Sequence, residues 1–198
     1  KRKQMRVEKL AREVWKFTDW AGLCSNVYLI DIDVPTLIDL GSKEFSRSLV
    51  RGLKEAGYSP ADIKKVIYTH LHFDHIGDPN VFKNAEFFAS QKEIDDLNNN
   101  KIGAFFALFG TNPNALLKGI ELKPIKHNSR FTIIETPGHT RGSICIWIKE
   151  KRILFSGDTL FANNILGRTD LPNSAPDDYE DSLKRLARFN YRILCPGH

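Results

Sequence analysis

The hydrophobic positions along this chain fall in short runs separated by turn-forming residues, a pattern that predicts many β-strands. Runs of β-branched and aromatic residues bounded by Gly, Pro, Asn or Asp are typical of strands. Such runs occupy residues 27–32, 36–40, 66–68, 86–89, 131–135, 144–148, 153–155 and 191–194. Asp33, Val34 and Pro35 form the predicted turn between the first two, because proline fits poorly inside a strand.

Three segments between these strands have the features of helices. Ser42 is a predicted N-cap for a helix that continues to residue 56, and Gly57 follows its end. Ser90 and Glu93 form a predicted capping box at the start of a second helix. A third helix is expected over residues 177–188. Because strands and helices occur in both halves of the chain, we expect an α+β fold with two packed sheets and helices outside.

Length and composition are those of an ordinary globular domain. With 198 residues and a mass of 22.6 kDa, residues 1–198 are expected to form a single domain. Apolar residues make up 41% and charged residues 27%, which excludes a disordered chain. The longest apolar run, residues 102–110, is shorter than the roughly 20 residues that span a bilayer, so no membrane partner is expected. Three cysteines without a CxxC pair favour a reducing, cytoplasmic location.

Two segments stand apart from the predicted sheets. The net charge is +5 and its excess lies at the beginning of the chain, so residues 1–25 are interpreted as a basic, solvated N-terminal lead-in. This modest excess gives no reason to expect a nucleic-acid partner. Residues 95–120 are predicted to be an irregular insertion that acts as a lid. Its apolar residues either cover an acyl-binding pocket or pack as a small helix in the core, and they include Phe105, Phe106, Leu108 and Phe109.

The segment that follows the third predicted strand carries the clearest chemistry. It reads Thr69-His70-Leu71-His72-Phe73-Asp74-His75. Alternate residues of an extended chain share a side, so His70, His72 and Asp74 are expected to point the same way. A turn after Asp74 would bring His75 to the same space. Imidazole nitrogens and carboxylate oxygens are ligands that zinc and similar divalent metals bind, so this segment predicts a metal site.

Three further ligand-type residues follow apolar strands later in the chain. His139 follows the strand that ends at Glu135, Asp158 follows the strand over 153–155, and His198 follows the last strand. Glycine precedes each of these ligands and permits the sharp turn that such a position needs.

These seven residues divide into two sets of metal ligands. The first set is His70, His72 and His139, and the second is Asp74, His75 and His198. Asp158 can bridge the two sets. Seven ligands suit two ions that share a carboxylate and leave open positions for substrate. The sequence therefore predicts two divalent metal ions as cofactors, zinc in preference to iron or manganese, and a small-molecule substrate.

In residue type, order and approximate spacing, this ligand pattern resembles that of the metallo-β-lactamase superfamily. The resemblance runs from about residue 26 to His198 and includes the His70-Leu71-His72-Phe73-Asp74-His75 motif, His139 and Asp158. It implies a four-layer αβ/βα sandwich, with two mixed β-sheets inside, helices outside and the metals at one edge of the sheets. It also implies hydrolysis as the activity, with the ligand roles on the residues named above.

A second run of residues resembles one branch of that superfamily. The segments 156–161 (SGDTLF) and 167–172 (GRTDLP) are similar to a run found in glyoxalase II-like enzymes, which cleave thioesters. Persulfide dioxygenases share this run and use one iron, so a mononuclear iron oxygenase is an alternative. The complete second ligand set favours two ions and therefore argues against this alternative. The HLHFDH motif is also common in lactonases of the superfamily, so a lactonase is a second alternative.

The expected reaction assigns a catalytic role to Asp74. This carboxylate is placed to bind one metal and to accept a hydrogen bond from the attacking water, and a metal polarises the substrate carbonyl. A thiolate leaving group needs little help from an acid, whereas an alkoxide needs more. A lactonase should therefore have a further proton donor near the metals, for which the candidates are Tyr28, Tyr68 and Thr140.

Overall fold

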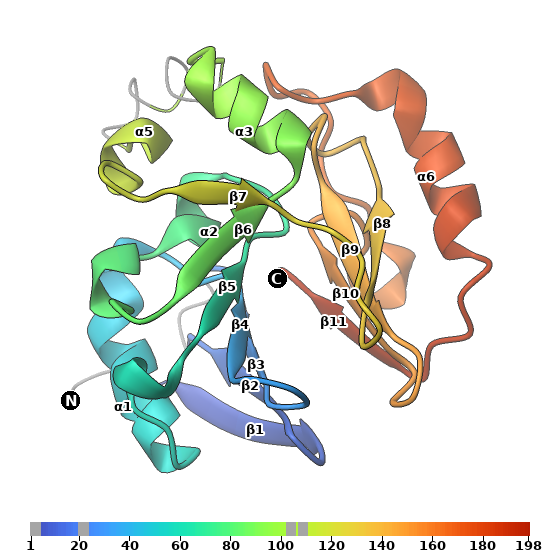
Figure 1. The fold of residues 1–198 in the computed structure, drawn as a ribbon. Helices are drawn as coiled ribbons and strands as arrows, with labels where there is room; N and C mark the ends of the chain where they lie inside the picture. The colour runs from blue at the N-terminus through green and yellow to red at the C-terminus, as the bar shows by residue number, and fades with distance from the viewer. Residues whose placement is uncertain (1–4, 20–23, 102–105, 107–110) are drawn as a thin grey trace.

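The computed structural model describes residues 5–19, 24–101, 106 and 111–198. In this part of the chain the strands form two sheets that face each other, with helices on their outer sides (Figure 1). The seven-stranded sheet has the order β1-β2-β3-β4-β5-β6-β7, and the four-stranded sheet has the order β11-β10-β9-β8. This arrangement is the predicted four-layer sandwich of α+β class.

The strands of the two sheets are short, and each sheet is mixed. The seven-stranded sheet contains β1 (Arg6–Ala11), β2 (Val14–Thr18), β3 (Val27–Ile30), β4 (Thr36–Ile38), β5 (Lys65–Ile67), β6 (Glu86–Ala89) and β7 (Leu122–Pro124). Its pairs are antiparallel from β1 to β4 and parallel from β4 to β7. The four-stranded sheet contains β8 (Thr132–Glu135), β9 (Ile144–Ile148), β10 (Ile153–Gly157) and β11 (Ile193–Pro196). Only the β10–β11 pair of this sheet is parallel.

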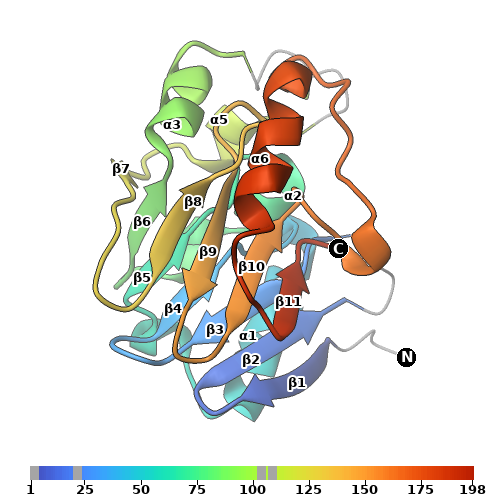
Figure 2. The same ribbon diagram turned by 90° about the vertical axis from the view of Figure 1, so that its right-hand side faces the viewer.

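The helices cover the outer faces of the sheets. They are α1 (Ser46–Glu55), α2 (Phe73–Ile76), α3 (Gln91–Asn98), α5 (Pro113–Leu116) and α6 (Tyr179–Leu186). Figures 1 and 2 show α1 outside the seven-stranded sheet and α6 across the outer face of the four-stranded sheet. Ser42 precedes a 3₁₀ turn (Lys43–Phe45) that continues into α1, without the predicted side-chain cap. No helix in the described residues is long and apolar enough to cross a membrane.

One hydrophobic cluster fills the space between the sheets. Tyr28 and Ile67 contribute from the seven-stranded sheet, and Ile146 and Phe155 contribute from the four-stranded sheet. A second cluster lies on the other face of the seven-stranded sheet, where Leu29 packs with residues of α1. The inner strands β3 and β4 are therefore buried on both faces, which explains why they read as continuous apolar runs.

The expectation of a solvated lead-in at residues 1–25 is wrong for residues 6–18. These residues form the β1–β2 hairpin, and β2 pairs with β3 inside the seven-stranded sheet. Val14 is buried between the sheets and Phe17 in the outer cluster, whereas Arg6 and Lys9 are exposed. Positive charge on the exposed face of an edge strand is compatible with pairing, and charge alone therefore did not identify this segment.

The interval 95–120 is only partly irregular. It contains the end of α3 and all of α5, and β7 follows directly after it. Of the predicted lid residues, Phe106 is described and buried, and Phe105, Leu108 and Phe109 lie outside the described residues.

Candidate metal centre

All seven predicted ligands lie on segments that follow strands at one edge of the sandwich. His70 and His72 follow β5, and Asp74 and His75 lie within α2. The expected alternation along an extended chain does not place Asp74, because the chain turns into α2 at Phe73. His139, Asp158 and His198 follow β8, β10 and β11, so both sheets supply ligands to one place.

The ligand atoms of these residues converge. They form three groups in which the nitrogen and oxygen atoms lie within 4.8 Å of one another: His70, His72 and His139; His70, His75 and Asp158; and Asp74, His75 and His198. The first and third groups are the two predicted sets, here termed the three-histidine group and the Asp74 group. Asp158 lies between them, with Oδ1 3.3 Å from His75 Nε2 and Oδ2 3.5 Å from His139 Nε2.

Asp39, at the end of β4, orients two of these histidines. Its Oδ2 accepts hydrogen bonds from His75 Nδ1 at 2.8 Å and from the Thr69 hydroxyl at 2.8 Å. Because that hydroxyl donates to Asp39, its oxygen can accept from His70 Nδ1, 3.2 Å away. When both rings are neutral, the Nε2 atoms of His70 and His75 therefore present lone pairs toward the centre, an arrangement typical of metal-binding histidines.

His72 and His139 are held in the same way by partners from the loop after β10. His72 Nε2 donates to Asn173 Oδ1 at 3.3 Å, and His139 Nδ1 donates to the Arg168 carbonyl at 2.8 Å. The remaining nitrogens, Nδ1 of His72 and Nε2 of His139, face each other 3.0 Å apart. Two lone pairs at this separation repel unless a positive charge lies between them.

The unpaired buried atoms of the site fit a divalent cation. His70 Nε2, His75 Nε2 and Asp158 Oδ1 are buried and form no hydrogen bond of good geometry, although the last two lie 3.3 Å apart as an ion pair. Buried polar groups without a partner are costly, and these three belong to the same converging group. Imidazole nitrogen and carboxylate oxygen are ligands for zinc and for iron, so the donor set is suited to either metal.

The electrostatics of the site favour neutral rings at His70 and His72 and draw positive charge to His75. Burial lowers the pKa of His70, and burial together with His139 lowers the pKa of His72 to about 3, so both rings are neutral. Burial would lower the pKa of His75, but the carboxylates of Asp158 and Asp39 raise it overall. Burial would raise the pKa of Asp158, but His75 lowers it overall. The carboxylates of Asp39 and Asp158 therefore attract positive charge at His75, which a bound cation would supply in place of the proton.

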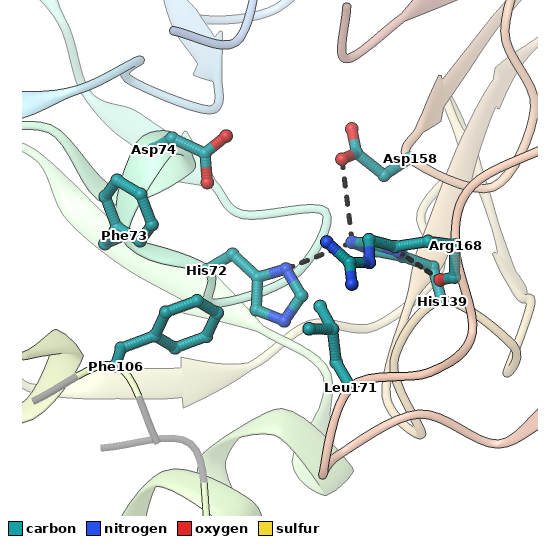
Figure 3. A pocket seen from close by; sticks show the side chains of 8 residues that line it. All are labelled: His72, Phe73, Asp74, Phe106, His139, Asp158, Arg168 and Leu171. Atoms are coloured by element: carbon teal, nitrogen blue, oxygen red, sulfur yellow. Dashed lines mark hydrogen bonds and ion pairs between the residues drawn. The ribbon is translucent and has the colours of Figure 1, made fainter. Parts of the chain in front are cut away.

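A cavity of about 420 Å³ opens beside the converging residues (Figure 3). His72, Asp74, His139 and Asp158 form its polar wall. Its apolar wall is made of Phe73, Phe106 and Leu171, and Arg168 completes the lining. Phe106 packs against His72 with ring centroids 5.0 Å apart, so this residue of the predicted lid lies at the site.

The comparisons with known proteins agree with this geometry. A family model described as the metallo-beta-lactamase superfamily matches residues 22–198. The chain belongs to this superfamily. It is 37% identical over 165 residues to the probable metallo-hydrolase MJ0296 of Methanocaldococcus jannaschii, which covers 82% of this chain and 70% of that protein.

Two further comparisons bear on the chemistry of this metallo-β-lactamase fold. The crystal structure of TTHA1623 in a di-iron-bound form matches with a TM-score of 0.73 and 26% identity, over 89% of this chain and 88% of that one. Acyl-coenzyme A thioesterase MBLAC2 of Gallus gallus is 27% identical over 155 residues, which covers 67% of this chain and 55% of that protein.

The roles of three residues around this metallo-β-lactamase site were not predicted from the sequence. Asp39 and Asn173 accept hydrogen bonds from predicted ligand histidines, and the Glu93 side chain accepts from the backbone beside them. Asp39 follows an apolar strand, as the predicted ligands do, and this signal could have identified it. Asn173 lies 101 residues from His72, and no local pattern connects them.

Asp39→Asn is expected to weaken metal binding without unfolding the protein. Asparagine tolerates the left-handed backbone of this position (φ 56°), but its single amide oxygen cannot accept both from the Thr69 backbone N–H, which binds Oδ1 of Asp39, and from His75, which binds Oδ2. We expect metal affinity to fall roughly 10–100-fold, as is typical when an outer hydrogen-bond partner is lost. Zinc titration against a chromophoric chelator measures this loss.

Asp31→Asn is the matched control, because Asp31 accepts only from Tyr58 among the hydrogen bonds found for it, away from the site. Equal affinities of Asp39→Asn and wild type would refute the role of Asp39.

Proposed function

We propose that this protein is a metal-dependent hydrolase that uses two divalent ions to cleave a small thioester or a related ester, as glyoxalase II-like enzymes do. The observation that carries the proposal is the convergence of two ligand groups around buried, unpaired nitrogen and oxygen atoms. Divalent ions held there would lower the pKa of water to about 7 and polarise a carbonyl oxygen.

The proposal assigns each ion to one of the two groups. His70, His72 and His139 would hold one ion, and Asp74, His75 and His198 would hold the other, with Asp158 in reach of both. Zinc is the metal we propose, because neutral imidazoles and carboxylates are its usual ligands in hydrolases. Iron and manganese are the alternatives, and the similarity to TTHA1623, which was solved in a di-iron-bound form, supports iron as one of them.

Asp74 is the proposed catalytic residue. Its carboxylate lines the cavity, and His198 Nε2 lies 3.2 Å from Asp74 Oδ2. Burial would raise the pKa of Asp74, but the hydrogen bond from His198 lowers it overall, so the group is ionised at neutral pH. An ionised carboxylate at the cavity wall can accept a hydrogen bond from the attacking water and orient that water toward the substrate carbonyl.

The hydroxyl groups near the site support a thioester over a lactone. The three candidate proton donors are already engaged: Tyr28 donates to the Pro196 carbonyl, Tyr68 to the Ile76 carbonyl and Thr140 to Glu93. No described residue of the cavity wall carries a hydroxyl. A thiolate leaves without an acid, whereas an alkoxide needs one. The resemblance to a protein named as an acyl-coenzyme A thioesterase points in the same direction.

The cavity wall indicates the kind of acyl group. Phe73, Phe106 and Leu171 form an apolar surface beside the polar wall. An apolar acyl group would bury this surface, at about 25 cal/mol per Å². We therefore propose a small thioester whose acyl group is apolar next to the scissile carbonyl.

Two alternative activities make different demands on the site. A lactonase of the same superfamily would share the metals and differ in the leaving group. A persulfide dioxygenase would use a single iron. The convergence of Asp74, His75 and His198 as a second group supports two ions over one.

A parallel assay separates these activities. Metal content is measured first, and then the same preparation is tested on thioesters with apolar acyl groups, on lactones, and on a persulfide with oxygen uptake recorded. The proposal predicts two zinc ions per chain and a thioester kcat/KM at least tenfold above that for any lactone. One iron per chain together with oxygen uptake would overturn the proposal in favour of a dioxygenase. Faster turnover of a lactone than of any thioester would overturn it in favour of a lactonase.

A further inference from the structure

Glu93 is a fully buried glutamate whose carboxylate serves only as a hydrogen-bond acceptor in the bonds found for it. It lies in the first turn of α3 and has 0% exposure. Its Oε2 accepts from the Leu71 backbone N–H at 2.7 Å. Its Oε1 accepts from the Thr140 hydroxyl at 2.6 Å and from the Gly142 backbone N–H at 3.2 Å. The predicted capping box is therefore only half right, because Ser90 caps the Glu93 N–H but the Glu93 side chain turns away.

These three hydrogen bonds join two ligand-bearing segments that are distant in sequence. Leu71 lies between His70 and His72, and Thr140 directly follows His139. Through Glu93, the segment after β5 is tied to the segment after β8. Both segments belong to the three-histidine group.

The Asp74 group is held by different contacts. The His75 carbonyl accepts from the Leu40 N–H at 2.8 Å, and the Asp74 carbonyl accepts from the Ser25 N–H at 3.3 Å. The Gly197 N–H next to His198 donates to the Gly157 carbonyl at 2.8 Å. None of these hydrogen bonds involves α3.

The packing leaves Glu93 little freedom to move. A Cβ atom on Gly142 would lie 2.6 Å from the Glu93 nitrogen and 2.7 Å from its Cγ. Ser90, at the start of α3, donates to the Gly142 carbonyl at 2.6 Å. The segment after His139 is thus pressed against the start of α3, and the Glu93 carboxylate is fixed between the two.

We propose that Glu93 is a positioning residue that sets the spacing of His70, His72 and His139 and thereby the metal affinity of the three-histidine group, independently of the Asp74 group. This inference rests on the proposed function, because it uses the ligand assignment made there. It adds a physical distinction between the two ions: one depends on α3 and the other does not.

Glu93→Gln is the sharpest substitution, because it keeps the size of the side chain and removes one acceptor. An amide has one oxygen and one NH₂ group. In either orientation of the amide, the N–H of Leu71 or that of Gly142 faces the NH₂ group. One segment of the three-histidine group then loses its hydrogen bond to α3.

The experiment measures the two metal sites separately. Glu93→Gln is introduced into a His198→Ala background, which isolates the three-histidine group, and into a His139→Ala background, which isolates the Asp74 group. Zinc affinity is measured in each by competition with a chromophoric chelator. We expect a roughly 10–100-fold loss in the first background and less than a twofold change in the second.

A second readout and two further variants complete the test. Amide hydrogen exchange of Leu71 or of Gly142 in the metal-free protein should speed up in Glu93→Gln. Asp95→Asn is the matched control, since Asp95 lies on the same helix, is exposed and accepts from Gln91. If Glu93→Gln does not fold, Thr140→Val removes one of the three donors and should lower the affinity of the three-histidine group alone, by about threefold or more.

Each outcome has a distinct meaning. Equal losses in both backgrounds, or no loss in the first, overturn the positioning role of Glu93. If wild-type protein binds no zinc, iron or manganese, the proposed function fails instead. Loss confined to the three-histidine group, with faster exchange at Leu71 or Gly142, supports the inference.

Discussion

Asp158→Ala is expected to abolish hydrolysis and to release metal at the same time. Asp158 Oδ1 lies 3.3 Å from His75 Nε2, and Oδ2 lies 3.5 Å from His139 Nε2 and 3.6 Å from His198 Nε2. Its removal leaves both ligand groups without their shared carboxylate. We expect kcat/KM on the best thioester to fall by more than about a thousandfold, beyond the 10–100-fold typical of a lost outer partner.

Metal analysis of the purified variant, together with the thioester assay, checks this prediction. Asp181→Ala is a suitable control, because Asp181 is an exposed carboxylate on α6. The variant should also melt at a lower temperature than wild type in the presence of zinc, since bound metal stabilises only the folded state. Full activity of Asp158→Ala at wild-type metal content would show that Asp158 does not bridge the two groups.

Gly197→Ala is expected to have a comparable effect for a steric reason. A Cβ atom at this position would lie 2.0 Å from Asp158 Oδ1 and 3.0 Å from His75 Cε1. Gly197 also precedes His198 and donates from its N–H to Gly157, so its backbone has little room to shift. A single methyl group would thus displace His75 and the shared carboxylate of Asp158, and we expect at least about a hundredfold loss of metal affinity.

The control for this substitution is another glycine. Gly119→Ala meets no atom within 4 Å but is strained, because Gly119 has a φ of 81°. It should lower the free energy of unfolding by about 1 kcal/mol and leave metal affinity unchanged. If Gly197→Ala binds zinc as tightly as wild type, the close packing of Gly197 against Asp158 does not shape the centre.

The sequence by itself determined most of the strands and the residue types that gather at the site. Apolar runs identified most of the strands, since strands that are buried on both faces need continuous hydrophobic residues. Ligand-type residues after several of these strands indicated one edge, because the sandwich brings the ends of its strands together there. That recurrence is visible without coordinates, and it placed His139, Asp158 and His198 beside the motif at residues 70–75.

Only the tertiary structure decided how the histidine rings of the site are oriented. The partners that fix the histidines come from other parts of the chain: Asp39 for His75, the Arg168 carbonyl for His139 and Asn173 for His72. The edge hairpin at residues 6–18 and the turn of α2 at Asp74 were likewise misread, since charge and local alternation do not specify pairing or the start of a helix. Hydrogen bonds across such distances depend on how strands and helices pack, and local sequence patterns carry no record of that packing.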